Sequence, residues 1–194
     1  MNRRPWAPPA PAEPGAPPAT PLRAAPTAPA RPPERLGPFT LHPPVGDGDQ
    51  QLLFAAYASS RQDDADLTSR HPESRRAVIE HEFESRQRSY PINFPRVEFF
   101  LLRLGGEPAG RVYLQLTPES VFVVDLVLLS GCRGRGHGSA LLRDLVRQAH
   151  GSGRAVRLHV AKTNARAAAL YQRLGFRAVE ELAQHFLLEL APHP

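Results

Sequence analysis

Residues 132–142 read CRGRGHGSALL and place glycines at alternate positions with arginines among them. An apolar, strand-like run (VFVVDLVLLS) precedes this segment, and a run with leucines on one helical face (GSALLRDLVRQAH) follows it. Glycine allows positive φ and a close approach of the backbone to a ligand. The start of a helix presents unpaired N–H groups to anions, and arginine can grip phosphate oxygens with two donors. The segment therefore predicts a phosphate-binding loop, the alternative being a glycine-rich turn without a chemical role. The residues concerned are Arg133, Gly134, Arg135, Gly136 and Gly138.

Two common phosphate loops do not fit this segment. A nucleotide-binding P-loop needs a lysine where His137 stands. A dinucleotide-binding loop needs a different glycine spacing and an acidic residue at the end of the next strand, where Val160 and Ala161 stand. The anion must therefore belong to another class of ligand.

The loop resembles the acyl-CoA loop of the GNAT superfamily of N-acetyltransferases, [QR]-x-x-G-x-[GA], with Arg133, Gly136 and Gly138 at the matching positions. A second block, NARAAALYQRLGF, is similar to the family's downstream segment N-x-x-A-x-x-[LF]-Y-x-x-x-G-F. The matching residues of that block are Asn164, Ala167, Leu170, Tyr171, Gly175 and Phe176. The resemblance implies acetyl-CoA as the cosubstrate and direct acetyl transfer to an amine.

The resemblance also implies where the cosubstrate binds. The strands at 121–129 and 155–161 would lie adjacent, parallel and splayed, with the pantetheine arm between them. An amide near Leu128 would polarise the thioester carbonyl, and the backbone of residues 133–138 would hold the diphosphate, with the His137 side chain facing solvent. The expected cofactor-binding residues are Leu126, Leu128, Arg133, Gly134, Arg135, Gly136, His137, Gly138, Asn164, Ala167 and Tyr171.

The chemistry needs a proton donor and a proton acceptor. Tyr171 matches the family's donor, because a phenol with a pKa near ~10 stays protonated at neutral pH and can protonate the departing thiolate. Asp125 and His159 are the catalytic candidates for removing the amine proton, since alternation points both away from their apolar strand neighbours. The alternative is a buried Asp–His pair that only fixes strand packing.

Residues 57–90 are expected to determine the acceptor. Asp63, Asp64 and Asp66 could attract a cationic amine or could form a solvated loop. The acceptor could be a small amine, an amino acid, an antibiotic or a protein N-terminus or lysine. The sequence leaves open a catalytically inert, CoA-binding regulatory GNAT domain, and a docking protein that uses an arginine-rich arm.

Composition limits the remaining possibilities. Fifteen of the 22 prolines fall in residues 1–44, so residues 1–35 are predicted to be a disordered extension of a domain at 36–194. That extension also carries much of the formal charge of +5, so no nucleic-acid partner is expected. No apolar run approaches ~20 residues, so we expect no membrane span and a cytoplasmic protein. With a single cysteine, Cys132, we expect no metal site. A homodimer through exposed C-terminal strands is possible.

The order of predicted elements is β-α-α-β-β-β-α-β-α-β-β. This order predicts an α/β (α+β) protein with a mixed central sheet of about six to seven strands, flanked by about four helices. The resemblance implies the same architecture, the GNAT fold.

Overall fold

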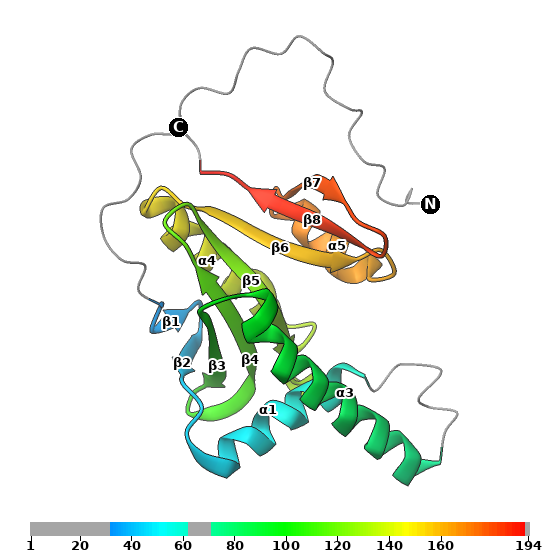
Figure 1. Cartoon of the computed structure of the whole chain (residues 1–194). Helices are drawn as coiled ribbons and strands as arrows, with labels where there is room; N and C mark the ends of the chain where they lie inside the picture. The colour runs from blue at the N-terminus through cyan, green and yellow to red at the C-terminus, as the bar shows by residue number, and fades with distance from the viewer. Residues whose placement is uncertain (1–31, 62–70, 193–194) are drawn as a thin grey trace.

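The computed structural model describes residues 32–61 and 71–192. Most of the predicted extension, residues 1–35, lies outside these ranges, as do Asp63, Asp64 and Asp66. The described residues form one mixed sheet with helices on both faces (Figure 1). The predicted element order is confirmed, with one addition: a two-residue strand at the start, which raises the number of strands in the sheet to eight.

The strands are β1 (Arg35–Leu36), β2 (Phe39–His42), β3 (Val97–Leu104), β4 (Glu107–Leu116), β5 (Ser120–Leu128), β6 (Ala155–Ala161), β7 (Arg177–Glu181) and β8 (His185–Leu190). The helices are α1 (Gly46–Ser60), α3 (Pro72–Asn93), α4 (His137–Gly151) and α5 (Ala165–Arg173), with a short 3₁₀ turn at Ser130–Cys132.

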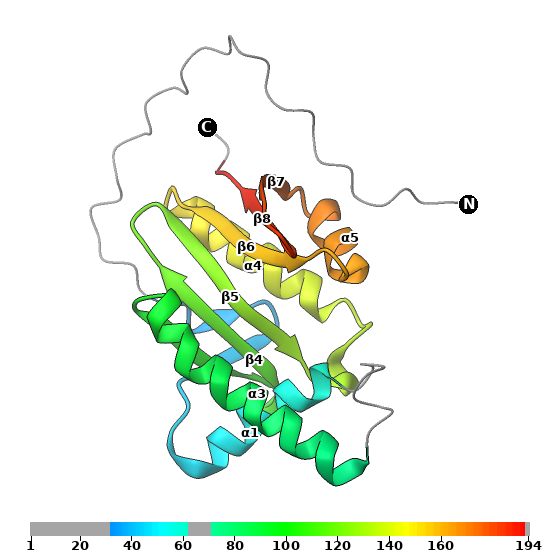
Figure 2. The same ribbon diagram turned by 45° about the vertical axis from the view of Figure 1, so that its right-hand side comes forward.

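The central feature of the sheet is the pairing of β5 with β6. The strand order is β1-β2-β3-β4-β5-β6-β8-β7, and β5 with β6 is its parallel pair. Their register runs from Ser120 opposite Ala155 to Val123 opposite Leu158 and then stops. Beyond that point the two strands diverge toward their carboxyl ends (Figure 2). The adjacent, parallel and splayed strands expected from the sequence are thus confirmed.

The two faces of the sheet are covered by different helices. On one face, α4 buries Leu141, Leu142, Leu145 and Ala149 in the main core. Because apolar side chains recur on one side of this helix, that face of the helix is removed from water. On the opposite face, α1 and α3 pack over β3, β4 and β5 around a second cluster that contains Leu53, Tyr90 and Tyr113.

A β-bulge in β5 changes which residues point to which face. Tyr113 pairs with Asp125, but its neighbour Leu114 pairs with Val123, so Val124 is an extra residue. Val123 and Leu126 therefore both point to the α4 face, while Val124 and Asp125 point to the α3 face. Because of the bulge, the Asp125 side chain points away from the core beneath α4 and toward the face covered by α3.

The ends of two helices have local explanations. Helix α3 continues to Asn93, so Pro91 lies in its last turn, where the missing N–H removes a single helical bond. Helix α1 begins at Gly46, and its N-cap is Val45. Asp49 accepts a hydrogen bond from the Val45 N–H at 2.8 Å, because a carboxylate near the start of a helix can reach back to an unpaired amide.

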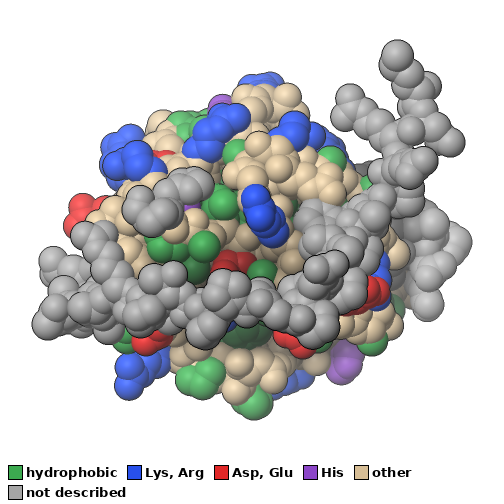
Figure 3. All heavy atoms as spheres, turned by 90° about the horizontal axis from the view of Figure 1, so that it is seen from above, with side chains coloured by type: hydrophobic (Ala, Val, Ile, Leu, Met, Phe, Trp, Pro, Cys, Tyr) green, Lys and Arg blue, Asp and Glu red, His purple; other side chains and the backbone are tan. Residues whose placement is uncertain are grey.

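Residues 32–61 and 71–192 lack two further classes of feature. No helix there is long and apolar enough to cross a membrane. No group of three or more His, Cys, Asp or Glu side chains in the same ranges could hold a metal ion. On the face seen in Figure 3, the Lys and Arg side chains occur at several separate places among neutral and apolar atoms.

Candidate active site

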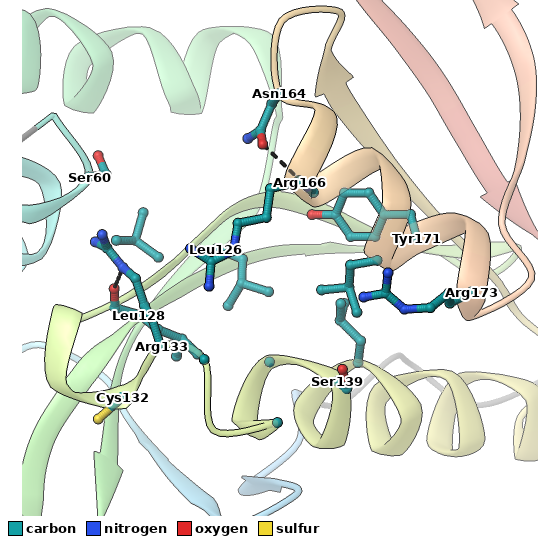
Figure 4. Close-up of a pocket in the computed structure, with 17 residues that line it drawn as sticks. Ser60, Leu126, Leu128, Cys132, Arg133, Ser139, Asn164, Arg166, Tyr171 and Arg173 are labelled. Atoms are coloured by element: carbon teal, nitrogen blue, oxygen red, sulfur yellow. Dashed lines mark hydrogen bonds between the residues drawn. The ribbon is translucent and has the colours of Figure 1, made fainter. Parts of the chain in front are cut away.

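A cavity of about 510 Å³ opens where β5 separates from β6 (Figure 4). Its walls come from the end of β5, the loop at 132–136, the first turns of α4, and α5. The predicted residues that line it are Leu126, Leu128, Arg133, Gly134, Gly136, Gly138, Asn164, Ala167 and Tyr171. Lining residues not singled out as binding from the sequence are Ser60, Val127, Cys132, Ser139, Leu142, Arg166, Leu170 and Arg173.

The glycine-rich loop lines this cavity and has main-chain amides without main-chain partners. Gly134 and Gly136 have φ of 74° and 79°, which a side chain at either position would strain. Gly136 is the N-cap of α4, and no side chain caps this helix. The first main-chain bond into α4 runs from the Ala140 N–H to the Gly136 carbonyl, and the amides of residues 134–139 donate no main-chain bond to other described residues. Free donors at the positive end of a helix favour the binding of an anion.

The side chain of Arg133 has a different role from the predicted one. Its Nε donates to the Leu128 carbonyl at 2.7 Å, and its Nη2 donates to Ser59 O at 3.0 Å and Ser59 Oγ at 2.8 Å. Its backbone N–H also has a partner, the Ser130 carbonyl at 3.1 Å. The Arg133 side chain was expected to bind phosphate, but it instead joins the end of β5 to the end of α1 by donating to carbonyls there; we call this arrangement the Arg133 bracket. Backbone carbonyls at the ends of elements need such donors.

Two other loop residues lie outside the cavity wall. Arg135 is exposed and does not line the cavity. The ring of His137 does not face solvent as expected: it stands edge-on to Phe39, with centroids 5.8 Å apart. The reason is that the first turn of α4 begins beside β2, so that the ring is covered. Neither residue therefore belongs to the cavity wall, which this loop lines through Arg133, Gly134, Gly136 and Gly138.

Helix α5 forms the wall opposite the loop. Asn164 is its N-cap, with Oδ1 accepting from the Ala167 N–H at 3.0 Å, so this asparagine fixes the start of the helix as well as lining the cavity. Tyr171 stands two turns further along, with its ring 5.7 Å from that of Phe176 and its hydroxyl pointing into the cavity (Figure 4). Burial, together with the negative charge of Asp125, raises the pKa of Tyr171 to about 12.

Asp125 is held by a buried arginine. Arg111 Nε lies 2.7 Å from Asp125 Oδ2, and the arginine side chain is 1% exposed. The guanidinium lies over the rings of Tyr57, Phe83 and Tyr113 at 4.9 to 5.7 Å, and its Nη1 donates to the Leu53 carbonyl at 3.2 Å. Burial raises the pKa of Asp125, and the charge of Arg111 opposes that rise. Asp125 does not line the cavity, because it projects to the α3 face.

His159 lies on the same face of the sheet as Asp125 but has different neighbours. It is exposed, and its ring centroid is 5.1 Å from that of Phe122 and 6.3 Å from that of His185. Burial and then the charge of His185 lower the pKa of His159. No hydrogen bond or ion pair joins Asp125 and His159, and the ion-pair partner of Asp125 is Arg111. The alternative of a buried Asp–His pair is therefore not what the structure contains.

Comparison with known proteins decides the family. The model of the acetyltransferase (GNAT) family matches residues 61–176, more than half of the chain. This chain belongs to the GNAT family. No curated protein sequence matches it.

Solved GNAT structures share the fold at low sequence identity. A PaiA N-acetyltransferase from Thermoplasma acidophilum in complex with coenzyme A is similar with a TM-score of 0.58 and 16% identity, over 79% of this chain and 98% of that one. An acetyltransferase from Thermus thermophilus gives 0.55 and 23%, over 79% and 96%. The Campylobacter jejuni N-acetyltransferase PseH in complex with acetyl coenzyme A gives 0.51 and 15%, over 80% and 98%.

The cavity of this GNAT domain suits coenzyme A on its own geometry. The free amides of residues 134–139 suit a diphosphate, and the unpaired edge of β5 beyond Val123 leaves room for an extended arm beside Leu126 and Leu128. The lining residues include three arginines and no carboxylate, so a polyanion meets no repulsion from the cavity wall.

Proposed function

We propose that this GNAT protein is an N-acetyltransferase that transfers the acetyl group of acetyl-CoA directly to an amine. The observation that supports this most directly is that the loop with its free amides, the end of β5 and Tyr171 all line one cavity, into which the Tyr171 hydroxyl points (Figure 4). One extended ligand could reach all three. The diphosphate would bind at the loop, and the thioester would lie near the gap between β5 and β6.

Tyr171 is proposed as the general acid. In direct transfer the amine nitrogen bonds to the thioester carbonyl carbon, the carbon–sulfur bond breaks, and the departing thiolate takes a proton. With its pKa raised to about 12, the Tyr171 phenol is fully protonated at neutral pH and can donate that proton. An amide near Leu128 is proposed to stabilise the developing oxyanion, as an oriented N–H does in other acyl transfers.

Asp125 and His159 are proposed to accept the proton that the attacking amine must lose. An alkylammonium has a pKa near ~10.4, so the nucleophile has to be deprotonated before it attacks. The two side chains face the same side of the sheet without touching, so a relay between them would pass through water. His159 is the more accessible of the two, and Asp125 is already engaged by Arg111.

The proposed acceptor is an amine on a small molecule, a protein N-terminus or a lysine. The face that would receive it is bordered by α1 and α3, as expected from the sequence, and Tyr57 and Tyr90 of these helices are buried against the sheet there. The segment with Asp63, Asp64 and Asp66 lies outside the described residues, so this proposal does not depend on it.

The experiment is an acceptor screen with acetyl-CoA and detection of the released thiol, run on the wild type and on Tyr171→Phe. We expect thiol release with at least one class of amine, and a large loss of turnover in the phenylalanine variant at unchanged coenzyme affinity. Tight coenzyme binding without turnover on any amine would favour the second candidate, a CoA-binding regulatory GNAT domain. The intact tyrosine at position 171, pointing into the cavity, supports the enzyme.

A further inference from the structure

The cavity wall carries positive charge outside the glycine-rich loop, from arginines of α5. Of its three arginines, Arg133 is committed to Leu128 and Ser59. The other two, Arg166 and Arg173, are exposed, and neither makes a hydrogen bond or an ion pair with any described residue. Seven other arginines among the described residues form ion pairs with carboxylates, as Arg147 does with Asp144 and Arg157 with Glu189. Two unpaired guanidinium groups on one cavity wall are available for an anionic ligand.

The helix places both arginines on the same side. Arg166 and Arg173 are seven residues apart in α5, which is about two turns, so their side chains leave the same face of the helix. The Asn164 cap fixes the first of these turns through its bond to the Ala167 N–H. In Figure 4 the side chain of Arg166 extends into the cavity, and Arg173 stands at the far end of α5, on the side of α4 and Ser139.

The position of Arg166 is electrostatically unfavourable in isolation. It is the second residue of α5, where the helix dipole carries its positive end, and a cation there is repelled rather than stabilised. No carboxylate lines the cavity to offset this repulsion. A bound anion would relieve it, and arginine suits phosphate in particular because it can present two parallel N–H donors.

We propose that Arg166 and Arg173 bind the ribose 3′-phosphate of coenzyme A, so that this protein distinguishes coenzyme A from 3′-dephospho-coenzyme A. The inference rests on the proposed function, since it assumes the same ligand in the same cavity. The loop amides of residues 134–139 provide for the diphosphate. The 3′-phosphate lies on the far side of the ribose from the diphosphate and needs a second set of donors, which α5 supplies from the opposite wall.

The test is a binding measurement that does not involve turnover. The affinities of coenzyme A and 3′-dephospho-coenzyme A are measured by titration calorimetry for the wild type, Arg166→Gln, Arg173→Gln and the double variant. Arg143→Gln is the matched control, because Arg143 is an exposed arginine of α4 that has no described partner and does not line the cavity. All three positions are exposed, so the variants are expected to fold like the wild type.

We expect the wild type to bind coenzyme A about tenfold or more tightly than the dephospho form, which is the range of one or two charge-assisted contacts. That ratio should fall toward one in the double variant, through weaker binding of coenzyme A alone, and should be unchanged in Arg143→Gln. A wild-type ratio of one, with both ligands bound, overturns this inference and leaves the proposed function standing. An equal loss for both ligands in the double variant also overturns it. Failure of the wild type to bind either ligand overturns both proposals.

Discussion

Arg133 Nη2 lies 2.8 Å from Ser59 Oγ, and this contact joins the glycine-rich loop to the last turn of α1, 74 residues earlier in the chain. The same guanidinium holds the carbonyl of Leu128 at the end of β5. One side chain therefore fixes three elements that meet at the cavity: a strand end, a loop and a helix end. Because α1 borders the face proposed for the acceptor, Arg133 connects the two proposed substrate sites.

Replacing Arg133 should therefore affect both stability and substrate binding. Arg133→Ala removes three part-buried hydrogen bonds and leaves carbonyls unpaired, so we expect a loss of about 1–3 kcal/mol in the free energy of unfolding and a higher KM for acetyl-CoA. Denaturant unfolding and initial-rate kinetics measure the two effects. Ser59→Ala, which removes only the side-chain acceptor, should lose less on both counts. Unchanged stability in Arg133→Ala would show that the bracket is not structural.

The glycines of the loop should differ in their tolerance of alanine. Gly136 has φ of 79°, so a side chain there imposes strain of about 1–2 kcal/mol even though the space around it is open. A Cβ at Gly138 would meet only the Cδ1 of Leu128, at an ordinary 3.7 Å. We expect Gly136→Ala to lower both stability and coenzyme affinity, and Gly138→Ala to leave them within a few-fold of the wild type. Calorimetric titration and thermal unfolding compare the pair, and equal effects would contradict the assignment of Gly136 as the strained position.

Tyr171→Phe should separate chemistry from binding. A general acid contributes about 10²–10⁴ in rate, so kcat should fall by about 100-fold or more while the affinity for coenzyme A stays the same. With a pKa of about 12, Tyr171 should produce no alkaline limb in the pH–rate curve of the wild type near neutral pH. Since the folded-state pKa is raised above 10.0, the associated stability is complete below pH 10 and is lost as the pH approaches 12. A phenylalanine variant as active as the wild type would remove the proposed donor.

The Arg111–Asp125 pair should respond differently to single and double substitution. Arg111→Met leaves a buried carboxylate without its partner, which costs about 3–5 kcal/mol. Arg111→Met with Asp125→Leu removes both charges and should be less destabilised than the single variant. The pKa of Asp125 is raised by burial and would rise further without Arg111, so protonation at acid pH should reduce the defect of Arg111→Met. Unfolding curves at acid and neutral pH provide the test; a defect that does not change with pH would argue against an unpaired carboxylate.

The relay through His159 can be tested by its pH dependence. The pKa of His159 is lowered from 6.5, so the acidic limb of kcat/KM should lie below pH 6.5. His185→Gln removes the repulsion from the neighbouring imidazole and should move that limb upward, while His159→Gln should abolish it. Asp125→Asn is the parallel variant on the other strand. If neither His159→Gln nor Asp125→Asn changes either limb, the proposed relay is wrong.

The local sequence pattern was sufficient to predict the helices, the strands and many of the residues that line the cavity. The apolar run VFVVDLVLLS predicted a strand and the run GSALLRDLVRQAH predicted a helix, and these correspond to β5 and α4. The two motif blocks and the strand before the loop predicted nine of the residues that line the cavity, because binding by backbone amides depends on glycines and a helix start, which are local properties.

The remaining features depend on residues that are distant in sequence. No local pattern pairs Arg133 with Ser59 or Arg111 with Asp125, since each contact exists only once the helices and strands are packed. Arg166 and Arg173 have no local sequence signal that marks them as lining residues. Their place on the cavity wall depends on how α5 packs beside the loop.

The order of the elements, the glycine-rich turn and the phenol at position 171 are properties of the chain, because they follow from backbone preferences and short-range spacing. Which charges are neutralised inside the protein, and which remain for a ligand, depends on how the elements pack. Every arginine has the same side chain, so its role depends on whether folding brings a carbonyl, a carboxylate or an open cavity within its reach.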